Sequence, residues 1–457
     1  TRLITLDRVT RKDAASDFFG EENVPTRAVT MGVGTILEAK RVVMIAFGEG
    51  KAPVVARAIE GAVTNSIAAS FLQEHPDARF VLDPASSAAL TRFHTPWLLG
   101  PIEDLGLQWD EATTKRAVIW LARTTGKAIL KLTQHDYDEH SMSSLVARHG
   151  SPGAVNGLVF NVLGAKIRGK SKLPRSMKTL CFSPHPDDDV ISMGGILRKF
   201  VENENDVTVA YMTSGNIAVF DHDVRRYMDF LVRLDEERIG KGTAVSSLAA
   251  TVHQFLEAKQ AGQVDIAEVQ DIKRIIRESE AVSGIEVMGL TREHARFLNL
   301  PFYQTGKVRK DPIGPADVAI VAQLLRELQP EIIFVAGDLS DPHGTHRMCK
   351  EAIDRALLEV YRGPNAPRAP QVWLYRGAWQ EWPVTEATVL VPMSQEELTL
   401  KIQAIFKHQS QKDSAPFPGQ DAREFWQRVE QRNKATSAQL DQLGLAEYFA
   451  MEAYVIA

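Results

Sequence analysis

From residue 178 onward, short apolar runs alternate with amphipathic stretches. Lys178–Phe182, Val207–Met212 and Ile332–Ala336 are apolar runs with the length and composition of buried strands. Apolar residues at helical spacing predict amphipathic helices at Ile191–Glu202, Asp223–Glu236, Val318–Leu328 and Gln395–Gln409. Strands that alternate with helices predict an α/β fold with a doubly wound, mostly parallel, Rossmann-like sheet.

The part of the chain before residue 164 shows this pattern only weakly. Arg41–Phe47 is a short apolar run rich in β-branched residues, which predicts a buried strand, and Phe80–Leu82 is a weaker strand candidate. Thr114–Thr124 and Ser141–Arg148 have helical periodicity. We therefore expect a partial α/β segment followed by a helical connector.

A change in composition marks a domain boundary. The stretch Gly164–Lys178 carries six basic residues and almost no large apolar ones, which is typical of a solvated linker. The expected organisation is a partial α/β segment, a helical connector, a linker and a C-terminal domain, at residues 1–95, 96–163, 164–177 and 178–457.

The composition restricts the class of protein. With 457 residues, 44% hydrophobic and 24% charged, the chain is typical of a globular protein of two or three domains. Its 53 Lys and Arg residues against 58 Asp and Glu residues give a net charge of −5, which argues against binding nucleic acid through a basic field. The sequence has no run of 18 apolar residues, so we expect no membrane-spanning helix.

Cysteine content and the N-terminal residues bear on location. Cys181 and Cys349 are the two cysteines, too few for a disulfide framework, and they fit a reducing compartment, so we expect a cytoplasmic protein. The first residue is Thr1, and residues 1–11 lack the apolar centre of a signal peptide. We expect the sequence to begin within a longer gene product.

Two polar segments each follow a predicted strand directly. Ser183–Asp189 reads SPHPDDD and follows the strand TLCF, and Asp338–His346 reads DLSDPHGTH and follows the strand IIFVA. Ligands of open parallel sheets bind at the carboxyl ends of the strands, where the connecting loops converge. The two segments are therefore expected to meet in space.

The side chains in these segments suit a metal ion. His185, Asp188 and His346 would supply the mixed nitrogen and oxygen ligands of a catalytic zinc, although iron, cobalt or manganese also fits this set. Asp187 is then suited to accept a proton from water, and His343 to protonate a leaving amine or stabilise an oxyanion. This arrangement predicts metal-assisted hydrolysis of an amide. The alternative is that the aspartates cap a helix and the histidines lie on the surface.

The same segments resemble a known family. SPHPDDDVISMGG is similar to the signature of the PIG-L/LmbE-like N-acetylglucosamine deacetylases, in which HPDD precedes a glycine pair, here Gly194 and Gly195. DPHGTH resembles the family's second motif, with Gly344 and Thr345 where proline and aspartate are usual. The resemblance covers about residues 178–457.

The deacetylase resemblance implies a role for each matching residue. It implies zinc ligands at His185, Asp188 and His346. It also implies that Asp187 is the general base and that His343 is the acid or the oxyanion partner. The roles that it implies agree with those reached from the residue types alone.

A second resemblance covers the first part of the chain. RAVTMGVGTILE, GEGKA, IEGAV and FLQEHPDARFVLD, in this order between residues 27 and 83, look like the second half of glucosamine-6-phosphate deaminase. In that family a lysine of the glycine-rich segment binds the sugar phosphate, which implies this role for Lys51. The family's catalytic G-H-x-A-F-N-E segment does not occur in this sequence. Lys51 is alternatively a solvated lysine near a helix start.

The expected function is metal-dependent removal of the N-acetyl group from an N-acetylglucosamine-type sugar, in amino-sugar metabolism. The alternatives are glucosamine-6-phosphate deaminase in a full-length form and a non-catalytic sugar-phosphate-binding module. The expected partner is a small amino-sugar substrate, with no nucleic acid and no membrane, and a homo-oligomer is compatible with the sequence. His408 and the stretch after it either border this site or form a surface loop.

Overall fold

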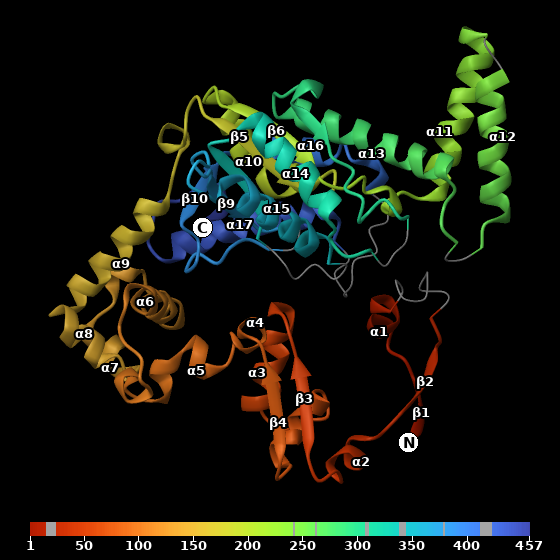
Figure 1. Ribbon diagram of the computed structural model, residues 1–457. Helices are drawn as coiled ribbons and strands as arrows, with labels where there is room; N and C mark the ends of the chain where they lie inside the picture. The colour runs from red at the N-terminus through yellow and green to blue at the C-terminus, as the bar shows by residue number, and fades with distance from the viewer. Residues whose placement is uncertain are drawn as a thin grey trace. The chain divides into compact units, whose positions relative to one another are not determined.

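The computed structural model divides the chain into two compact units, each described by itself below. The first comprises Thr1–Arg11, Pro25–Ala165 and Leu440–Ala446, and the second Lys12–Val24, Lys166–Gln439 and Glu447–Ala457. Figure 1 colours the chain by residue number. The structure describes residues 1–14, 24–240, 243–260, 263–306, 310–337, 344–377, 380–411 and 423–457.

The second unit is built on a seven-stranded sheet with the order β10-β11-β9-β8-β5-β6-β7. Strands β9, β8, β5, β6 and β7 run parallel, whereas β11 is antiparallel to both β9 and β10. The predicted mostly parallel α/β sheet is therefore confirmed. The strands are β5 (Lys178–Ser183), β6 (Asp206–Tyr211), β7 (Ala295–Phe297), β8 (Ile332–Ala336), β9 (Gln371–Tyr375), β10 (Val389–Met393) and β11 (Ala450–Ile456).

Helices cover both faces of this sheet. On β5, Cys181 belongs to a core shared with α10, α13 and α16, whereas Leu180 and Phe182 belong to a core shared with α14 and α15. Because successive side chains of a strand point to opposite faces, this division shows a doubly wound sheet. The helices are α10 (Asp188–Glu202), α13 (Ala267–Val287), α14 (Pro315–Leu328), α15 (Thr345–Tyr361), α16 (Gln395–Ile405) and α17 (Phe425–Gln442).

The glycine pair on α10 allows close packing against a buried ion pair. A Cβ atom on Gly194 would lie 2.8 Å from Cγ of Lys401, and one on Gly195 would lie 2.3 Å from Sδ of Met393 and 3.0 Å from Cδ of Glu452. Glu452 accepts a hydrogen bond from the Gly195 N–H at 2.9 Å and pairs with Lys401 at 2.6 Å. Both charged side chains are fully buried. The glycines thus bring α10 against β10, β11 and α16.

An additional pair of helices precedes α13. α11 (Asp221–Leu234) and α12 (Thr243–Ala258) lie side by side in Figure 1. They share a small core with α13 that includes Val224, Val252 and Val269.

The later part of the first unit is helical. The helices expected at residues 114–124 and 141–148 are present as α6 and α8, and Trp97 and Trp109 are buried with rings 6.3 Å apart, which is core packing. α9 runs into the predicted linker, whose position as a domain boundary stays a prediction. The helices are α6 (Glu111–Thr125), α7 (Gln134–Glu139), α8 (Ser143–His149) and α9 (Pro152–Lys166).

The earlier part of the first unit holds two small sheets. β1 pairs with β2 in antiparallel fashion, and β3 pairs with β4 in parallel. The strand expected at residues 41–47 is present as β3, but the expectation that it is buried is wrong. Val43 is 51% exposed and Ile45 is 60% exposed, because the described residues leave that face of the sheet uncovered. The elements are β1 (Arg2–Thr5), α1 (Arg8–Asp13), β2 (Arg27–Thr30), α2 (Val33–Leu37), β3 (Val42–Ala46), α3 (Ala52–Glu60), β4 (Ala78–Leu82), α4 (Pro84–Ser87) and α5 (Thr91–His94).

Candidate functional site

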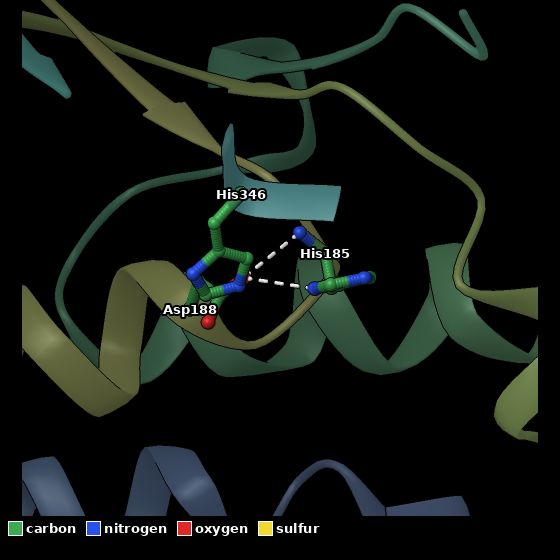
Figure 2. A group of neighbouring side chains, drawn as sticks. All are labelled: His185, Asp188 and His346. Carbon is green, nitrogen blue, oxygen red and sulfur yellow. Dashed lines mark hydrogen bonds and ion pairs between the residues drawn. The ribbon is translucent and has the colours of Figure 1, made fainter. Parts of the chain in front are cut away.

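The carboxyl ends of two neighbouring parallel strands position the candidate site. β5 and β8 pair in parallel at the centre of the sheet. His185 and Asp188 lie where the chain passes from β5 into α10, and His346 lies in the first turn of α15, which follows β8 in the chain. Figure 2 shows the three side chains pointing toward one another. The expected meeting of the two segments is observed for these residues.

The geometry of this cluster fits a divalent metal ion. One ligating atom from each of His185, Asp188 and His346 lies within 4.8 Å of the others. Oδ2 of Asp188 lies 3.2 Å from Nδ1 of His185 and 3.1 Å from Nε2 of His346 (Figure 2). Tetrahedral ligands at zinc-ligand distances of about 2.0–2.1 Å lie roughly 3.3 Å from one another, so the two distances from Asp188 are close to those between zinc ligands.

Asp188 has the electrostatic surroundings of an anionic ligand. Burial raises its pKa, but the charge of His346 and hydrogen bonds from His185 and His346 outweigh burial and hold the pKa of Asp188 well below its usual value. The backbone N–H of His185 also donates to Oδ2 of Asp188 at 3.0 Å. Asp188 is therefore a carboxylate, as metal binding requires.

Asp187 is buried beside this cluster and pairs with an arginine. Nη2 of Arg277, on α13, lies 3.0 Å from Oδ2 of Asp187 and donates to the Pro186 carbonyl oxygen at 2.6 Å. Although Asp187 is the residue before α10, its side chain makes no capping hydrogen bond. Burial raises the pKa of Asp187, and the charge of Arg277 opposes this shift. A raised pKa suits a carboxylate that exchanges protons near neutral pH.

Asp189 is a buried carboxyl group that sequence reasoning did not assign. It accepts hydrogen bonds from the Tyr211 hydroxyl at 2.9 Å and from Ser183 Oγ at 3.3 Å. Burial raises its pKa to about 7. The run of three aspartates in the sequence was the available signal, but the run does not show which carboxylate faces the core.

His408 borders the same pocket as Asp187. It is 3% exposed, and among the described residues neither of its ring nitrogens has a hydrogen-bond partner. Burial, together with the charge of Arg277, lowers the pKa of His408 to about 3, so the imidazole is neutral. Of the two alternatives for His408, the structure favours the border of the site. The pocket is lined by Asp187, Ile191, Ile405, Phe406, His408, Gln411, Glu424, Phe425 and Trp426.

Two further residues beside the cluster carried no sequence signal. The Tyr303 ring lies 6.2 Å from the His185 ring, and Nζ of Lys310 lies 3.9 Å from the centre of the Tyr303 ring. Burial lowers the pKa of Lys310 to about 8. Tyr303 therefore contacts His185 of the candidate cluster edge-to-face, and Lys310 lies over the Tyr303 ring.

The remaining predicted residues are placed as follows. His343 lies outside the described residues. Gly344, the departure from the family's second motif, has φ of 72°, a left-handed conformation that favours glycine. Lys51 is exposed in the first unit, at the end of a short 3-10 helix (Glu49–Lys51) before α3.

Comparisons with known proteins agree with these features. Residues 180–357 match the family described as PIG-L, GlcNAc-PI de-N-acetylase. A glucosamine-6-phosphate deaminase-like protein of Bacteroides thetaiotaomicron is 45% identical over 471 residues, which cover 100% of this chain and 70% of that protein. A glucosamine-6-phosphate deaminase of Rhodopirellula baltica is 47% identical over 92 residues, which cover 20% of this chain and 37% of that protein.

Solved structures add only a weak similarity. N,N'-diacetylchitobiose deacetylase from Pyrococcus horikoshii is 18% identical with a TM-score of 0.38, and the match covers 62% of this chain and 84% of that chain. A TM-score this low carries no inference about function. None of the helices in the described part of the chain combines the length and apolar character needed to cross a membrane. The extent and identity of the Bacteroides match show that the chain belongs to the family of glucosamine-6-phosphate deaminase-like proteins, and its residues 180–357 form a PIG-L domain.

Proposed function

We propose that this protein is a metal-dependent N-deacetylase that hydrolyses the acetamide of an N-acetylglucosamine-type sugar. The observation that carries the proposal is the convergence of His185, Asp188 and His346 beside the buried Asp187. The match to a family described as a de-N-acetylase supports the reaction class. The match to the deaminase-like protein supports an amino-sugar substrate.

Different residues would supply the metal ligands, the proton acceptor and the acid for amide hydrolysis. His185, Asp188 and His346 would hold the metal ion, with zinc favoured by the mixed donor set. A bound divalent ion lowers the pKa of a coordinated water and polarises a carbonyl. Oδ2 of Asp187 is bonded to Arg277, so we assign Oδ1 of Asp187 to accept the proton of the attacking water. His343 remains our proposed acid for the leaving amine.

Burial sets the basicity and the orientation of the side chains at this site. The carboxyl of Asp187 is removed from bulk water, which makes it a stronger proton acceptor than an exposed aspartate. Arg277 holds that carboxylate in one orientation through the bonds to Asp187 and Pro186. The neutral imidazole of His408, which lines the same pocket, can donate or accept one hydrogen bond to a sugar hydroxyl.

The test is acetate release by the purified, zinc-loaded chain, with metal content measured in parallel. Asp187→Asn keeps the shape and removes the base, so we expect metal to be retained and the rate to fall by roughly 10²–10⁴. Asp188→Asn removes the anionic ligand, so we expect metal binding to weaken. Asp271→Asn, an exposed carboxylate on α13, is the matched control and should behave as the parent.

Three results would contradict the assignment. Loss of metal from Asp187→Asn, with metal retained and activity lost in Asp188→Asn, would exchange the two roles. Parental rates in both variants would place the catalytic site elsewhere. A metal-loaded parent that releases no acetate from N-acetylglucosamine or its 6-phosphate would refute the proposed function.

A second candidate function rests on the match to glucosamine-6-phosphate deaminases. We propose that Lys51 contacts a sugar phosphate in a full-length deaminase form. Because the sequence lacks the G-H-x-A-F-N-E segment, we expect this chain alone to release no ammonia from glucosamine 6-phosphate. Ammonia release that depends on Lys51 would overturn this reading. A non-catalytic sugar-phosphate module is less well supported, since it would not need Asp187 beside the metal-binding cluster.

The proposed setting is cytoplasmic. Cys181 and Cys349 are the two cysteines of the sequence and both are buried, and so low a cysteine content supports a reducing compartment. The proposed partner is the amino-sugar substrate.

A further inference from the structure

One side of α11 carries apolar side chains that the described residues leave exposed. Tyr227 is 37% exposed, Phe230 is 60% exposed and Leu231 is 43% exposed. Val224 and Met228 of the same helix are instead buried in the small core shared with α12 and α13. Residues three and four apart lie on the same side of a helix, so Phe230 and Leu231 lie beside Tyr227 on one face. These three residues form an apolar surface, called the α11 stripe below.

A cluster of ion pairs holds the base of the helix pair. Nζ of Lys273, on α13, lies 2.6 Å from Oδ1 of Asp221 and 2.8 Å from Oδ2 of Asp265. Nζ of Lys259, directly after α12, lies 2.7 Å from a carboxylate oxygen of each of the same two aspartates. Lys273 is buried, so its ion pairs are screened less than those at the surface. The helices that carry the α11 stripe are therefore fixed to α13, and no ordering of the helix pair is needed before the stripe binds a partner.

Four side chains form the edge of α11 next to this stripe. Arg226, Phe230, Arg233 and Glu237 follow one another at spacings of four, three and four residues, which places them along one side of the helix. The three charged side chains are each more than half exposed. Nε of Arg233 lies 2.8 Å from Oε1 of Glu237, so this edge continues past the end of α11 into the π-helical turn Asp235–Ile239.

The edge is complementary to itself when a second copy of α11 runs antiparallel to the first. About a two-fold axis midway between Phe230 and Arg233, each Arg226 faces Glu237 of the second copy. Each Phe230 then faces Arg233 of the second copy. The first contact is an ion pair, and the second places a guanidinium over an aromatic ring. A parallel arrangement would instead set every charge against the same charge, so the edge favours the antiparallel one.

In the single chain these charges contact neighbours on the same helix. Nη2 of Arg226 lies 2.9 Å from Oδ1 of Asp223, and Arg233 pairs with Glu237. Exposed ion pairs of this kind contribute little to stability. A guanidinium has five N–H donors and a carboxylate accepts several hydrogen bonds, so these groups keep capacity for a second partner.

The charge of this region favours a protein over a lipid surface as the partner. Residues 221–239 contain four arginines against six Asp and Glu residues. A helix that lies on an anionic membrane typically carries an excess of Lys and Arg around its apolar face. A second copy of the same helix needs no such excess, because its charges match those of the first in the antiparallel arrangement.

We propose that α11 is the interface of a homodimer, in which the α11 stripe and its edge pack antiparallel against the same surface of a second copy. The apolar part of the interface is short, because Asp223 and Arg238 bound the stripe at its two ends. Two helices of this length bury less than the roughly 1,600 Å² of a standard interface, so we expect a weak dimer that depends on protein concentration.

The first test is sedimentation velocity of the purified chain over a range of protein concentrations. We expect the mass of a dimer to appear as the concentration rises. Leu231→Asp should weaken dimerisation by roughly 10–100-fold or more, because each dimer buries this position twice. Leu358→Asp is the matched control, because Leu358 is 58% exposed and lies on α15. Circular dichroism shows whether each variant is folded.

The second test exchanges charges between the two copies. Arg226→Glu and Glu237→Arg each bring like charges together twice in a dimer, so each variant alone should dimerise roughly 10-fold or more weakly. An equimolar mixture should associate about as strongly as the parent. In the mixed dimer the two substituted side chains have opposite charge and face each other, and the native Arg226 and Glu237 meet at the other contact. Mixing cannot repair a folding defect, so recovery is specific to the antiparallel contact.

Three results would overturn the proposal. A chain that stays monomeric at every concentration, or a dimer that Leu231→Asp leaves intact, shows that the α11 stripe is not its interface. A mixture of Arg226→Glu and Glu237→Arg that stays as weak as either variant refutes the antiparallel pairing. Binding of a monomer to vesicles of phosphatidylcholine and phosphatidylserine, lost in Leu231→Asp, assigns the stripe to a membrane instead. None of these measurements depends on acetate release, so the deacetylase proposal is tested separately.

Discussion

Removing the charge of Arg277 should move the pH dependence of deacetylation. Nη2 of Arg277 lies 3.0 Å from Oδ2 of Asp187, and Arg277 is 1% exposed. Unit charges about 4 Å apart interact by about 4 kcal/mol at an effective dielectric constant near 20, which corresponds to roughly 3 pKa units as an upper bound. A neighbouring cation typically lowers a carboxylate pKa by about 1–3 units. Arg277→Gln should therefore raise the pKa of Asp187 by about that amount.

The sign of the effect follows from the role of Asp187. A general base acts only when deprotonated, so a higher pKa shifts the acidic limb of kcat/KM to higher pH by about 1–3 units. Arg277→Lys keeps a positive charge and should leave the limb close to that of the parent, which separates the effect of charge from that of packing.

The assay is acetate release from pH 5 to pH 9, with metal content determined at each pH. Metal content is needed because protonation of His185 or His346 would also reduce activity at low pH. Two results would refute the reasoning: an unmoved limb in Arg277→Gln with normal metal content, or an equal shift in Arg277→Lys. Either one would show that the ion pair with Asp187 does not set the protonation of the base.

Two predictions concern stability. Gly195→Ala would place a Cβ atom 2.3 Å from Sδ of Met393, so we expect the free energy of unfolding to fall by about 1–3 kcal/mol and the melting temperature to drop. Gly157→Ala on α9 has open space around its Cβ position and should be neutral or slightly stabilising, so equal melting temperatures of the two variants would contradict the prediction. Asp136 accepts a hydrogen bond from Lys127 at 2.7 Å, and this bond, with those at the start of α7, lowers its pKa to about 2. The stabilisation that ionised Asp136 gives the folded protein is present above the unfolded-state pKa near 4 and is lost as the pH falls toward 2. Asp136→Asn should therefore lower the free energy of unfolding in urea by about 0.5–2 kcal/mol at pH 7, and by progressively less below pH 4.

The central strands could be predicted because their sequences reflect burial on both faces. β5 and β8 read as continuous apolar runs, since helices cover both sides of the sheet there. The sequence of β11 is not a continuous apolar run, because Glu452 interrupts it. That glutamate is buried with Lys401, a partner 51 residues away in the sequence, and no local pattern shows such a pairing. The burial of β3 was predicted wrongly, because an apolar run does not show whether its cover is present.

The convergence of the three proposed metal ligands could be predicted because each lies in a segment that follows a strand of the parallel sheet. His185, Asp188 and His346 lie where the topology of a parallel sheet brings loops together. Arg277 is different, since it comes from a helix 90 residues after Asp187 and reads locally as one charged position on an amphipathic helix. Its role depends on which face of α13 meets the β5–α10 turn, which is set by tertiary packing.

The proposed site and the exposed strand β3 belong to different units of the chain. The candidate metal cluster, Asp187, Arg277 and His408 all belong to the second unit, in which both faces of the parallel sheet are covered. The exposed face at Ile45 belongs to the first unit, in which neither strand of the parallel pair is buried. A preorganised hydrolytic site needs buried, fixed side chains, and the second unit supplies them without a further polypeptide. We therefore expect the purified, metal-loaded chain to release acetate, and substitutions in the first unit such as Lys51→Ala to leave that rate unchanged.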